Sequence, residues 1–343
     1  MVVLVTGSSG LVGSEAVRFF DAQGADVHGV DNNMRADFFG PGGDTTPVRR
    51  QLETACRRFT HHDLDVRDRP AMSRLFETLP VDVVVHAAAQ PSHDLARSRP
   101  FDDFDVNAGG TLNLLEATRQ WRPDAVFCHM STNKVYGDAP NERPLRETPT
   151  RWDYAEAADR DGISESCRID QSEHSVFGAS KTAADVMAQE YARGFGLKVG
   201  VFRAGCVTGA AHAGVEMHGF LNYFAKVARA GGRYRIFGYK GKQVRDQIHA
   251  VDVVGAVHEF VKAPRPGEVY NIGGGRENSV SILECIETVE QRTGRPFDHE
   301  YVDEHRRGDH ICYISNLRKL RSHYPAWTIT RDLPSIWDEL LGR

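Results

Sequence analysis

The sequence of 343 residues lacks the features that mark disulfide-rich, zinc-binding and membrane proteins. Its six cysteines include no C-x-x-C pair, so neither a disulfide framework nor a zinc site is expected. No apolar run approaches the roughly eighteen residues that a membrane helix needs, and no signal peptide precedes the first strand pattern. A formal charge of -5 offers no basic surface for nucleic acid. These absences predict a cytoplasmic globular protein without metal, nucleic-acid or membrane partners.

The N-terminal stretch V-V-L-V-T-G-S-S-G-L-V-G is the most informative segment that is present. Residues 2–5 have the pattern of a buried strand, and a helical pattern begins at Leu11. Between them, Gly7 permits a tight turn, Gly10 lets the backbone approach a pyrophosphate, and Gly13 lets the helix pack on its strand. The helix N-terminus also offers unpaired N–H groups to an anion. The segment therefore predicts a dinucleotide site.

The residue Asp31 indicates which dinucleotide is bound. It ends a second strand pattern that begins near Val27, at about the separation from Gly13 that is expected of a ribose-binding carboxylate. A carboxylate accepts hydrogen bonds from a ribose 2′-hydroxyl and repels a 2′-phosphate, so NAD is favoured over NADP. Arg35, close by, weakens this preference.

Strand and helix patterns alternate along the first two thirds of the chain. Strands are expected at residues 2–5, 27–31, 59–63, 81–86, 125–130 and 197–202, and crossover helices at 10–23, 69–78, 101–121 and 180–194. This alternation predicts an α/β fold with a doubly wound parallel sheet. We expect residues 1–203 to form the dinucleotide-binding domain. Residues 204–343 should form mainly a smaller substrate-binding lobe, with some segments returning to the main sheet.

Two stretches lack regular patterns, at residues 39–46 and 137–171. A loop as long as the second is usually functional or disordered. Just before it, the strand at 125–130 runs into Ser131 and Thr132. Ligands bind beyond the carboxyl ends of strands in open α/β sheets, so Thr132 is expected to face a nicotinamide and the reacting carbon.

The segment S-V-F-G-A-S-K at residues 175–181 supplies a partner for Thr132. Here the chain resembles the extended short-chain dehydrogenase/reductases of the NAD-dependent epimerase/dehydratase family, whose Ser/Thr and Tyr-x-x-x-Lys residues remove a hydroxyl proton while NAD takes the hydride. The likeness extends from Gly7 to the C-terminal lobe and implies catalytic roles for Thr132 and Lys181. Phe177 stands where the family has its tyrosine. Phenylalanine has no ionisable group, so the usual proton acceptor is missing.

Three further segments are similar to the CDP-paratose (CDP-tyvelose) 2-epimerases, which invert a sugar carbon through a transient ketone. They are S-T-N-K-V-Y-G at 131–137, G-K-Q-V-R-D at 241–246 and N-I-G-G-G at 271–275. Related sugar-nucleotide dehydratases typically carry Asp-Glu after the catalytic threonine, whereas this chain has Asn133 and Lys134. The resemblance therefore disfavours dehydration. The segment V-T-G-A-A-H at 207–212 departs from the pattern expected on the substrate side.

The resemblance also implies binding residues. Beyond Gly7, Gly10, Gly13, Asp31 and Arg35, the cofactor set comprises Leu11, Val12, Asn32, Asn33, Asp65, Val66, Ala87, Ala88, Ala89, Gln90, Asn107 and Lys181. The guanidinium groups of Arg245 and Arg307 are candidates for a nucleotide diphosphate because each can form two parallel bonds to phosphate. Solvated arginines are the alternative. The candidates for the sugar pocket are His93, Asn133, His174, Cys206 and His212.

The missing tyrosine leaves the acid/base open. Glu165, Cys167 and His174 are the candidates, because they lie in or just after the long polar stretch before Phe177. A second interpretation is that phenylalanine has replaced an original tyrosine. The sequence predicts an NAD-dependent nucleotide-sugar epimerase, with a nucleotide-sugar dehydrogenase or decarboxylase, or a catalytically silent NAD-binding sensor or scaffold, as alternatives. Family likeness implies a homodimer formed through the helices expected at 101–121 and 180–194.

Overall fold

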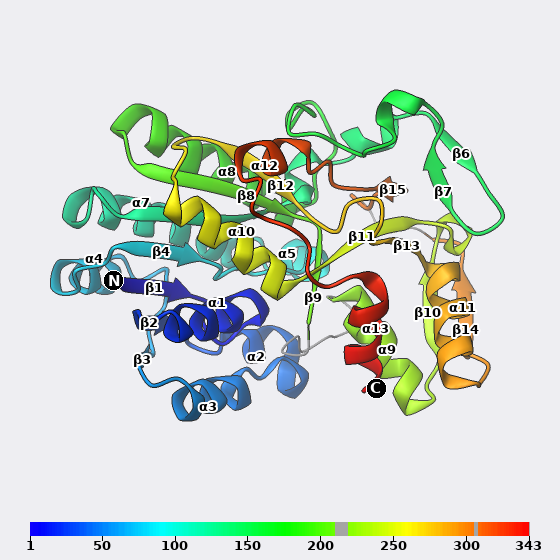
Figure 1. The fold of residues 1–343 in the computed structure, drawn as a ribbon, viewed down its shortest axis with the longest axis horizontal. Coiled ribbons are helices and arrows are strands. Elements are labelled where there is room, and N and C mark those ends of the chain that lie inside the picture. The colour runs from blue at the N-terminus through cyan, green and yellow to red at the C-terminus, as the bar shows by residue number, and fades with distance from the viewer. Residues whose placement is uncertain (210–218, 305–307, 343) are drawn as a thin grey trace.

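The computed structural model describes residues 1–209, 219–304 and 308–342, and its centre is a seven-stranded parallel sheet (Figure 1). The strand order is β12-β8-β5-β4-β1-β2-β3, and every neighbouring pair is parallel. The strands are β1 (Val2–Thr6), β2 (Asp26–Val30), β3 (Phe59–His62), β4 (Val83–His86), β5 (Val126–Thr132), β8 (Lys198–Ala204) and β12 (Val269–Ile272). Their apolar runs are buried because helices cover both faces of the sheet. The predicted doubly wound parallel sheet is confirmed.

Two layers of helices enclose this sheet. One face packs against α1 (Leu11–Ala22), α3 (Thr46–Ala55), α10 (Ala250–Lys262) and α12 (Arg318–His323). The other face packs against α4 (Arg69–Thr78), α7 (Gly110–Trp121) and α8 (Val176–Phe195). Although β12, α10 and α12 come from the last third of the chain, they lie in these layers, so the C-terminal part contributes to both regions of the molecule.

The helix expected over residues 101–121 is interrupted. It consists of α6 (Pro100–Phe104), a π turn η2 (Asp105–Gly109) and α7. A Cβ atom on Gly110 would lie 2.7 Å from Cγ2 of Val66, so the absence of a side chain allows α7 to approach the segment after β3 closely. The π turn points Asn107 toward the buried interior.

The irregular stretch expected at 39–46 contains helical turns. It follows α2 (Met34–Phe39), includes η1 (Gly40–Gly43) and leads into α3. Only Leu52 of α3 is buried in the core, and the helix has few apolar residues, so it was not expected from the sequence.

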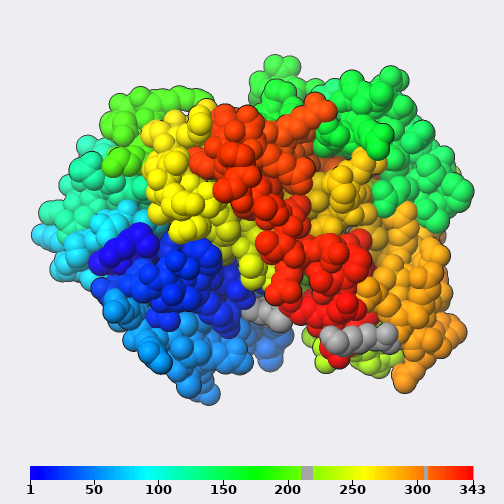
Figure 2. Space-filling view, in the orientation of Figure 1, coloured from blue at the N-terminus to red at the C-terminus, as the bar shows by residue number. Residues whose placement is uncertain are grey.

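A smaller lobe packs beside the sheet and has its own apolar core (Figures 1 and 2). Its helices are α9 (Phe220–Ala230), α11 (Ile282–Thr293) and α13 (Leu333–Leu341). Its strands are β9 (Cys206–Thr208), β10 (Tyr234–Phe237), β11 (Val244–His249), β13 (Ser279–Ser281), β14 (His299–Val302) and β15 (Cys312–Tyr313), with the turn η6 (Tyr239–Gly241) between β10 and β11. No helix within the described residues is long and apolar enough to cross a membrane.

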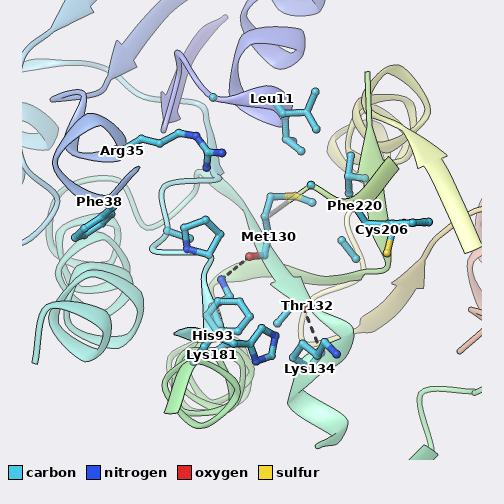
Figure 3. Close-up of a pocket in the computed structure, with 18 of the residues that line it drawn as sticks. Leu11, Arg35, Phe38, His93, Met130, Thr132, Lys134, Lys181, Cys206 and Phe220 are labelled. Atoms are coloured by element: carbon cyan, nitrogen blue, oxygen red, sulfur yellow. Dashed lines mark hydrogen bonds between the residues drawn. The ribbon is translucent and has the colours of Figure 1, made fainter. Parts of the chain in front are cut away.

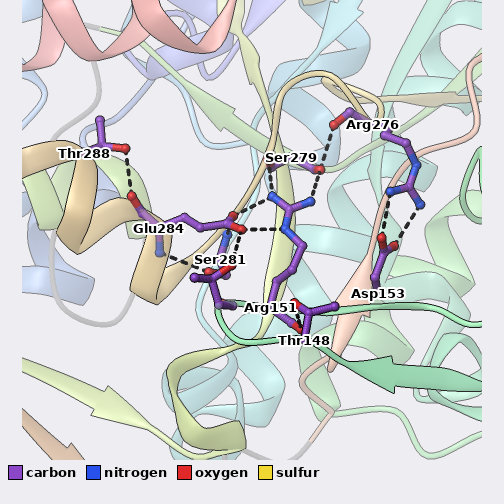
Figure 4. A network of polar contacts seen from close by, with 9 residues as sticks. Thr148, Arg151, Asp153, Arg276, Ser279, Ser281, Glu284 and Thr288 are labelled. Carbon is purple, nitrogen blue, oxygen red and sulfur yellow. Dashed lines mark hydrogen bonds and ion pairs between the residues drawn. The ribbon is translucent and has the colours of Figure 1, made fainter.

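The long polar stretch at 137–171 is folded onto this lobe. It contains η4 (Ala139–Glu142), the antiparallel pair β6 (Leu145–Glu147) and β7 (Trp152–Tyr154), and η5 (Ala157–Asp159). Figure 4 shows how it is attached: Arg151 donates to Glu284 at 2.7 and 2.5 Å, and Arg276 donates to Asp153 at 2.9 Å. Such charge-assisted bonds with fixed guanidinium geometry fasten the stretch to α11 and to the loop before β13.

Candidate active site

A cavity of about 1100 Å³ runs from the carboxyl ends of β1 and β2 to the lobe (Figure 3). Its walls come from the turn after β1, the ends of β4 and β5, the start of α8, and α9 and β10 of the lobe. Ligands bind beyond the carboxyl ends of parallel strands in such folds. The cavity therefore lies where the sheet itself predicts a site.

The glycine-rich turn forms one end of this cavity. Gly7 has φ of +65° and donates its N–H to the carbonyl of Val30 at 2.8 Å. A Cβ atom on Gly7 would lie 2.8 Å from the nitrogen of Ala88, and one on Gly13 only 2.0 Å from the carbonyl oxygen of Gly7. A side chain at either position would collide with the backbone and force the turn to change shape, so the two glycines keep the tight turn that fits a dinucleotide.

The carboxylate of Asp31 shapes the same turn. It accepts hydrogen bonds from the backbone N–H of Ser9 at 3.0 Å and of Asn33 at 2.9 Å, and it lines the cavity. Each carboxylate oxygen still has a lone pair for a ribose hydroxyl. Arg35 also lines the cavity; burial lowers its pKa to about 10, which leaves it cationic at neutral pH. An acidic and a basic group thus stand together at the position that distinguishes NAD from NADP.

Most of the remaining predicted cofactor residues also lie on the cavity wall. They are Gly10, Leu11, Val12, Asn32, Asp65, Val66, Ala87, Ala88 and Ala89. Asn33 does not line it, because its side chain is bound to Asp44 at 2.8 Å and Thr45 at 2.9 Å.

Gln90 and Asn107 are not among the residues that line the cavity, and their cofactor role stays a prediction. Gln90 donates to Asp103 at 2.7 Å, and Asn107 donates to Ser180 at 3.0 Å and to the carbonyl of Gln90 at 3.1 Å. Ser180 donates to the other oxygen of Asp103 at 2.5 Å. These buried groups satisfy one another. Their role is to hold the segment after β4 against α6 and α8.

Thr132 and Lys181 both line the cavity. Thr132 ends β5 and caps η3 (Asn133–Tyr136) by accepting the N–H of Lys134 at 3.2 Å. Lys181 lies in the second turn of α8 and donates to the carbonyl of Met130 at 2.7 Å (Figure 3). Burial lowers the pKa of Lys181 to about 8, against the opposing attraction of Asp185 and Asp103. The hydroxyl and the lysine therefore share a wall with the glycine-rich turn.

Phe177 lies one turn before Lys181, and its buried ring also lines the cavity. The ring of His93, the first residue of α5 (His93–Ser98), packs against the ring of Phe177. The two ring centroids are 5.0 Å apart at an interplanar angle of 63°, an edge-to-face contact. The position of the missing phenol is thus bordered by an imidazole.

Of the three candidate acid/base groups, His174 lines the cavity, whereas Glu165 and Cys167 do not. Glu165 does not line the cavity; its Oε1 accepts the backbone N–H of Asn271 at 2.8 Å. Cys167 also lies off the cavity, packed against a cluster that contains Tyr136 and Tyr154. Burial raises the pKa of both groups. His174 does line the cavity, but its Nδ1 and Nε2 lie 3.0 and 2.8 Å from the carbonyls of Ser172 and Val135.

Three charged residues gather at the substrate end. Asp309 accepts from Arg245 at 2.5 Å and from Lys134 at 3.2 Å, and Lys134 also donates to the carbonyl of Gly308 at 3.1 Å. Burial alone would raise the pKa of Asp309, but Arg245 and Lys134 outweigh it and hold that pKa well below its ordinary range. The trio carries a net charge of +1 at neutral pH.

Of the other predicted substrate residues, Asn133 and Cys206 line the cavity, and burial raises the pKa of Cys206 to about 11. Arg307 and His212 lie outside the described residues. Sequence reasoning gave no binding role to the wall residues Lys134, Phe220, Tyr223, Tyr234 and Arg235. The amphipathic pattern of α9 indicates packing, but nothing in it tells which residues meet the cavity.

Comparisons with known proteins agree with this geometry. The model of the NAD dependent epimerase/dehydratase family matches residues 3–273. The CDP-paratose 2-epimerase of Salmonella typhi is 32% identical over 328 residues, which cover 93% of this chain and 92% of that protein. The dTDP-glucose 4,6-dehydratase 1 of Escherichia coli K12 is 28% identical over 285 residues, covering 81% of this chain and 73% of that protein. The structure of Thermus thermophilus UDP-glucose 4-epimerase in complex with NAD aligns with a TM-score of 0.76 at 25% identity, covering 99% of this chain and 98% of that one.

Proposed function

Because the chain belongs to the NAD dependent epimerase/dehydratase family, we propose that it is an NAD-dependent epimerase of nucleotide-diphosphate sugars. The observation that carries the proposal is the continuity of one cavity, which joins the glycine-rich turn to Thr132 and Lys181 and extends into the lobe. NAD is the cofactor of this family, and the cradle of Gly7, Gly13 and Asp31 fits it. When bound, NAD supplies the acceptor and later the donor of a hydride for one sugar carbon.

The residues that follow Thr132 favour epimerisation over dehydration. Asn133 is a buried neutral amide, and Lys134 is a cation bound to Asp309 and to the carbonyl of Gly308. Elimination of water needs an acid that protonates the departing hydroxyl, and segment 131–137 offers no carboxyl group for that step. Inversion of one carbon needs no such leaving-group acid.

Each group of side chains in the cavity has a separate role in the proposed epimerisation. Thr132 can hold the reacting hydroxyl, and the ammonium of Lys181 can bind a nicotinamide ribose and favour a nearby anion. The trio of Lys134, Arg245 and Asp309, with its net positive charge, suits a sugar-linked diphosphate. Anchoring the nucleotide tail there would keep the keto sugar in the cavity while it presents its other face.

The proposal is tested by incubating the purified protein with a panel of nucleotide-diphosphate sugars in deuterated buffer. NADH absorbance and sugar stereochemistry are followed together, with the Lys181→Met variant as the inactive control. An epimer formed without free NADH is the expected result. Accumulated NADH would instead identify a dehydrogenase or decarboxylase, and tight NAD binding without any turnover would identify a catalytically silent NAD-binding protein.

The cytoplasmic location of the protein stays a prediction.

We also propose that the protein forms a homodimer through the outer faces of α6, α7 and α8. Large apolar side chains are exposed there: Phe101 by 84%, Phe104 by 50%, Val186 by 46% and Phe195 by 56%. These side chains lie on helices that pack on one another, because α6 and α7 both contact α8, and burial against a second copy would remove them from water. Sedimentation velocity should report a dimer that the Phe101→Glu/Val186→Glu variant converts to a monomer; a monomeric unsubstituted protein would contradict the proposal.

A further inference from the structure

We propose that His93 is the catalytic acid/base of this enzyme, taking the part that the Phe177 ring cannot play. The inference rests on the proposed epimerase function and adds to it a group that the family likeness does not supply. It is carried by the contact between the His93 and Phe177 rings on the wall of the cavity.

The imidazole lies within the group of residues that surrounds the reacting position. His93 and Phe177 have ring centroids 5.0 Å apart, and Phe177 stands one helical turn before Lys181. Figure 3 shows His93, Lys181 and Thr132 around the same hollow. An imidazole exchanges protons near neutral pH, which suits an acid/base better than an unassisted phenol.

The segment that carries His93 is held rigidly. Gln90 accepts the N–H of Ser92 at 2.6 Å and donates to Asp103 at 2.7 Å, and Ser92 caps α5 by accepting the N–H of Leu95 at 3.3 Å. Asp103 in turn accepts from Ser180 of α8 at 2.5 Å. The polar network behind the wall therefore fixes the start of α5 against the helix that carries Phe177 and Lys181. Supported side chains of this kind are what proton transfer requires.

Several other proton-exchanging groups among the described residues near Thr132 are held by contacts of their own. Both ring nitrogens of His174 face backbone carbonyls, and Lys134 is bound to Asp309. Lys181 donates to the carbonyl of Met130, an arrangement suited to orienting ligands with a positive charge. Glu165 and Cys167 do not reach the cavity. Among the described residues, His93 is the imidazole whose ring contacts that of Phe177 on the cavity wall.

The proton transfer balances as follows. While the sugar carbon is oxidised and NAD is reduced, the O–H bond of the reacting hydroxyl breaks, a C=O bond forms, and the proton moves to an imidazole nitrogen of His93. When the carbon is reduced again on its other face, the imidazolium returns the proton to the oxygen. The enzyme ends the cycle in its starting protonation state.

The central experiment compares the NAD-loaded His93→Gln variant with the unsubstituted holoenzyme and with His299→Gln, a control at an exposed histidine of β14. Turnover of His93→Gln should fall roughly 10²–10⁴-fold, the usual contribution of a positioned acid/base. Its NAD affinity by calorimetry should stay within about 3-fold, a difference of under 1 kcal/mol, because the glycine-rich turn is untouched. His299→Gln should match the unsubstituted enzyme in both measurements.

Two rescues separate proton transfer from a packing role. Adding Phe177→Tyr to His93→Gln places a phenol one turn before Lys181 and should restore turnover at least tenfold. Free imidazole should likewise activate His93→Gly. In the unsubstituted holoenzyme, NMR signals of the His93 ring, assigned through their contact with the Phe177 ring, should shift when the nucleotide sugar binds.

The outcomes distinguish the two proposals. If the unsubstituted enzyme epimerises no sugar of the panel, the proposed function fails. If it does, and His93→Gln keeps more than a tenth of the turnover, the role of His93 is overturned. Loss of turnover that neither rescue restores, with NAD affinity kept, also overturns it. Should the variants not fold, His93 signals that do not respond to the sugar would overturn the inference in the unsubstituted protein.

Discussion

The two ends of the cavity are built in different ways. At the dinucleotide end, one contiguous segment supplies a cradle of backbone atoms around Gly7 and Gly13. At the substrate end, Lys134, Arg245 and Asp309 come from three separate segments: Asp309 follows Arg245 by 64 positions and Lys134 by 175. A backbone cradle depends on local chain geometry, whereas an ion cluster depends on the tertiary fold. The cradle is therefore visible in the sequence and tolerates little change. For the ion cluster, the sequence indicates Arg245 as a phosphate ligand but does not show that Lys134 and Asp309 join it.

The largest expected effect concerns a buried ion pair beneath the dinucleotide half. Asp185 binds Arg203 at 2.8 and 3.0 Å and accepts from Ser131 at 2.6 Å, and both charges are buried. Asp185→Ala leaves the guanidinium without its partner, so the free energy of unfolding should fall by about 3–5 kcal/mol in urea titrations. Asp298→Ala, which removes an exposed partner of Arg233, should change it by less than about 1 kcal/mol. Equal losses of unfolding free energy in the two variants would contradict the prediction that the buried ion pair contributes more than the exposed one.

Lys181, between the two ends, should make stability depend on pH. Its pKa is about 8 in the folded chain and about 10.5 when unfolded, so the folded state releases its proton first as the pH rises. The unsubstituted protein should therefore gain stability relative to Lys181→Met between pH 8 and 10.5, on the order of 3 kcal/mol. Urea titrations at several pH values measure the gain, with exposed Lys226→Met as the control. A constant difference across this range would contradict the prediction.

Adding a single methyl group at Gly13 should weaken NAD binding at the dinucleotide end of the cavity. In Gly13→Ala the new Cβ would lie 2.0 Å from the carbonyl oxygen of Gly7, so the turn or α1 must move. NAD affinity should fall about 100-fold, equivalent to about 2.7 kcal/mol, and calorimetry measures it. Gly232→Ala, whose nearest neighbour atom would lie 3.6 Å away, should bind NAD normally. Normal binding by Gly13→Ala would refute the cradle.

The smallest effect belongs to the substrate end. The pKa of Asp309 is lower in the folded than in the unfolded chain, so its stabilisation is complete above its ordinary value near 4 and is lost as the pH falls further. Asp309→Asn should cost about 1–2 kcal/mol at pH 7, with some solvent screening because the side chain is 30% exposed. The difference from the unsubstituted protein should shrink below about pH 4. A stability difference between the two proteins that grows as the pH falls would contradict this prediction.

The fold was predictable where apolar patterns are contiguous. Six of the seven strands of the sheet, the helix α4 and the glycine-rich turn were expected close to their observed positions, because burial between two helix layers imposes long apolar runs. The sequence pattern did not locate β12. The helix α3 buries only Leu52 in the core and gave no such signal. The π turn at Asp105–Gly109 was also missed, because one extra residue in a helical turn leaves the surrounding apolar spacing nearly unchanged.

The candidate site was predictable where residue type and strand end coincide. Thr132, Lys181 and Asp31 follow from the sheet and from family likeness, and they lie on the cavity. Glu165 was chosen because it lies in a long polar stretch, but that stretch folds against the lobe and binds Asn271 of β12. His93 was expected as a sugar contact; its place beside Phe177 depends on how α5 packs on α8, which no local pattern records.

The carboxylate of Asp309 affects how strongly the cavity attracts an anionic ligand and how fast the ligand leaves. It keeps Lys134 and Arg245 together before any ligand arrives, so their mutual repulsion is already cancelled. An incoming polyanion is then attracted by a surplus of one charge instead of two. Capture of a polyanion should respond only mildly to ionic strength, and its release should be fast. Retention of the sugar during the reaction would then depend on the shape of the lobe rather than on charge.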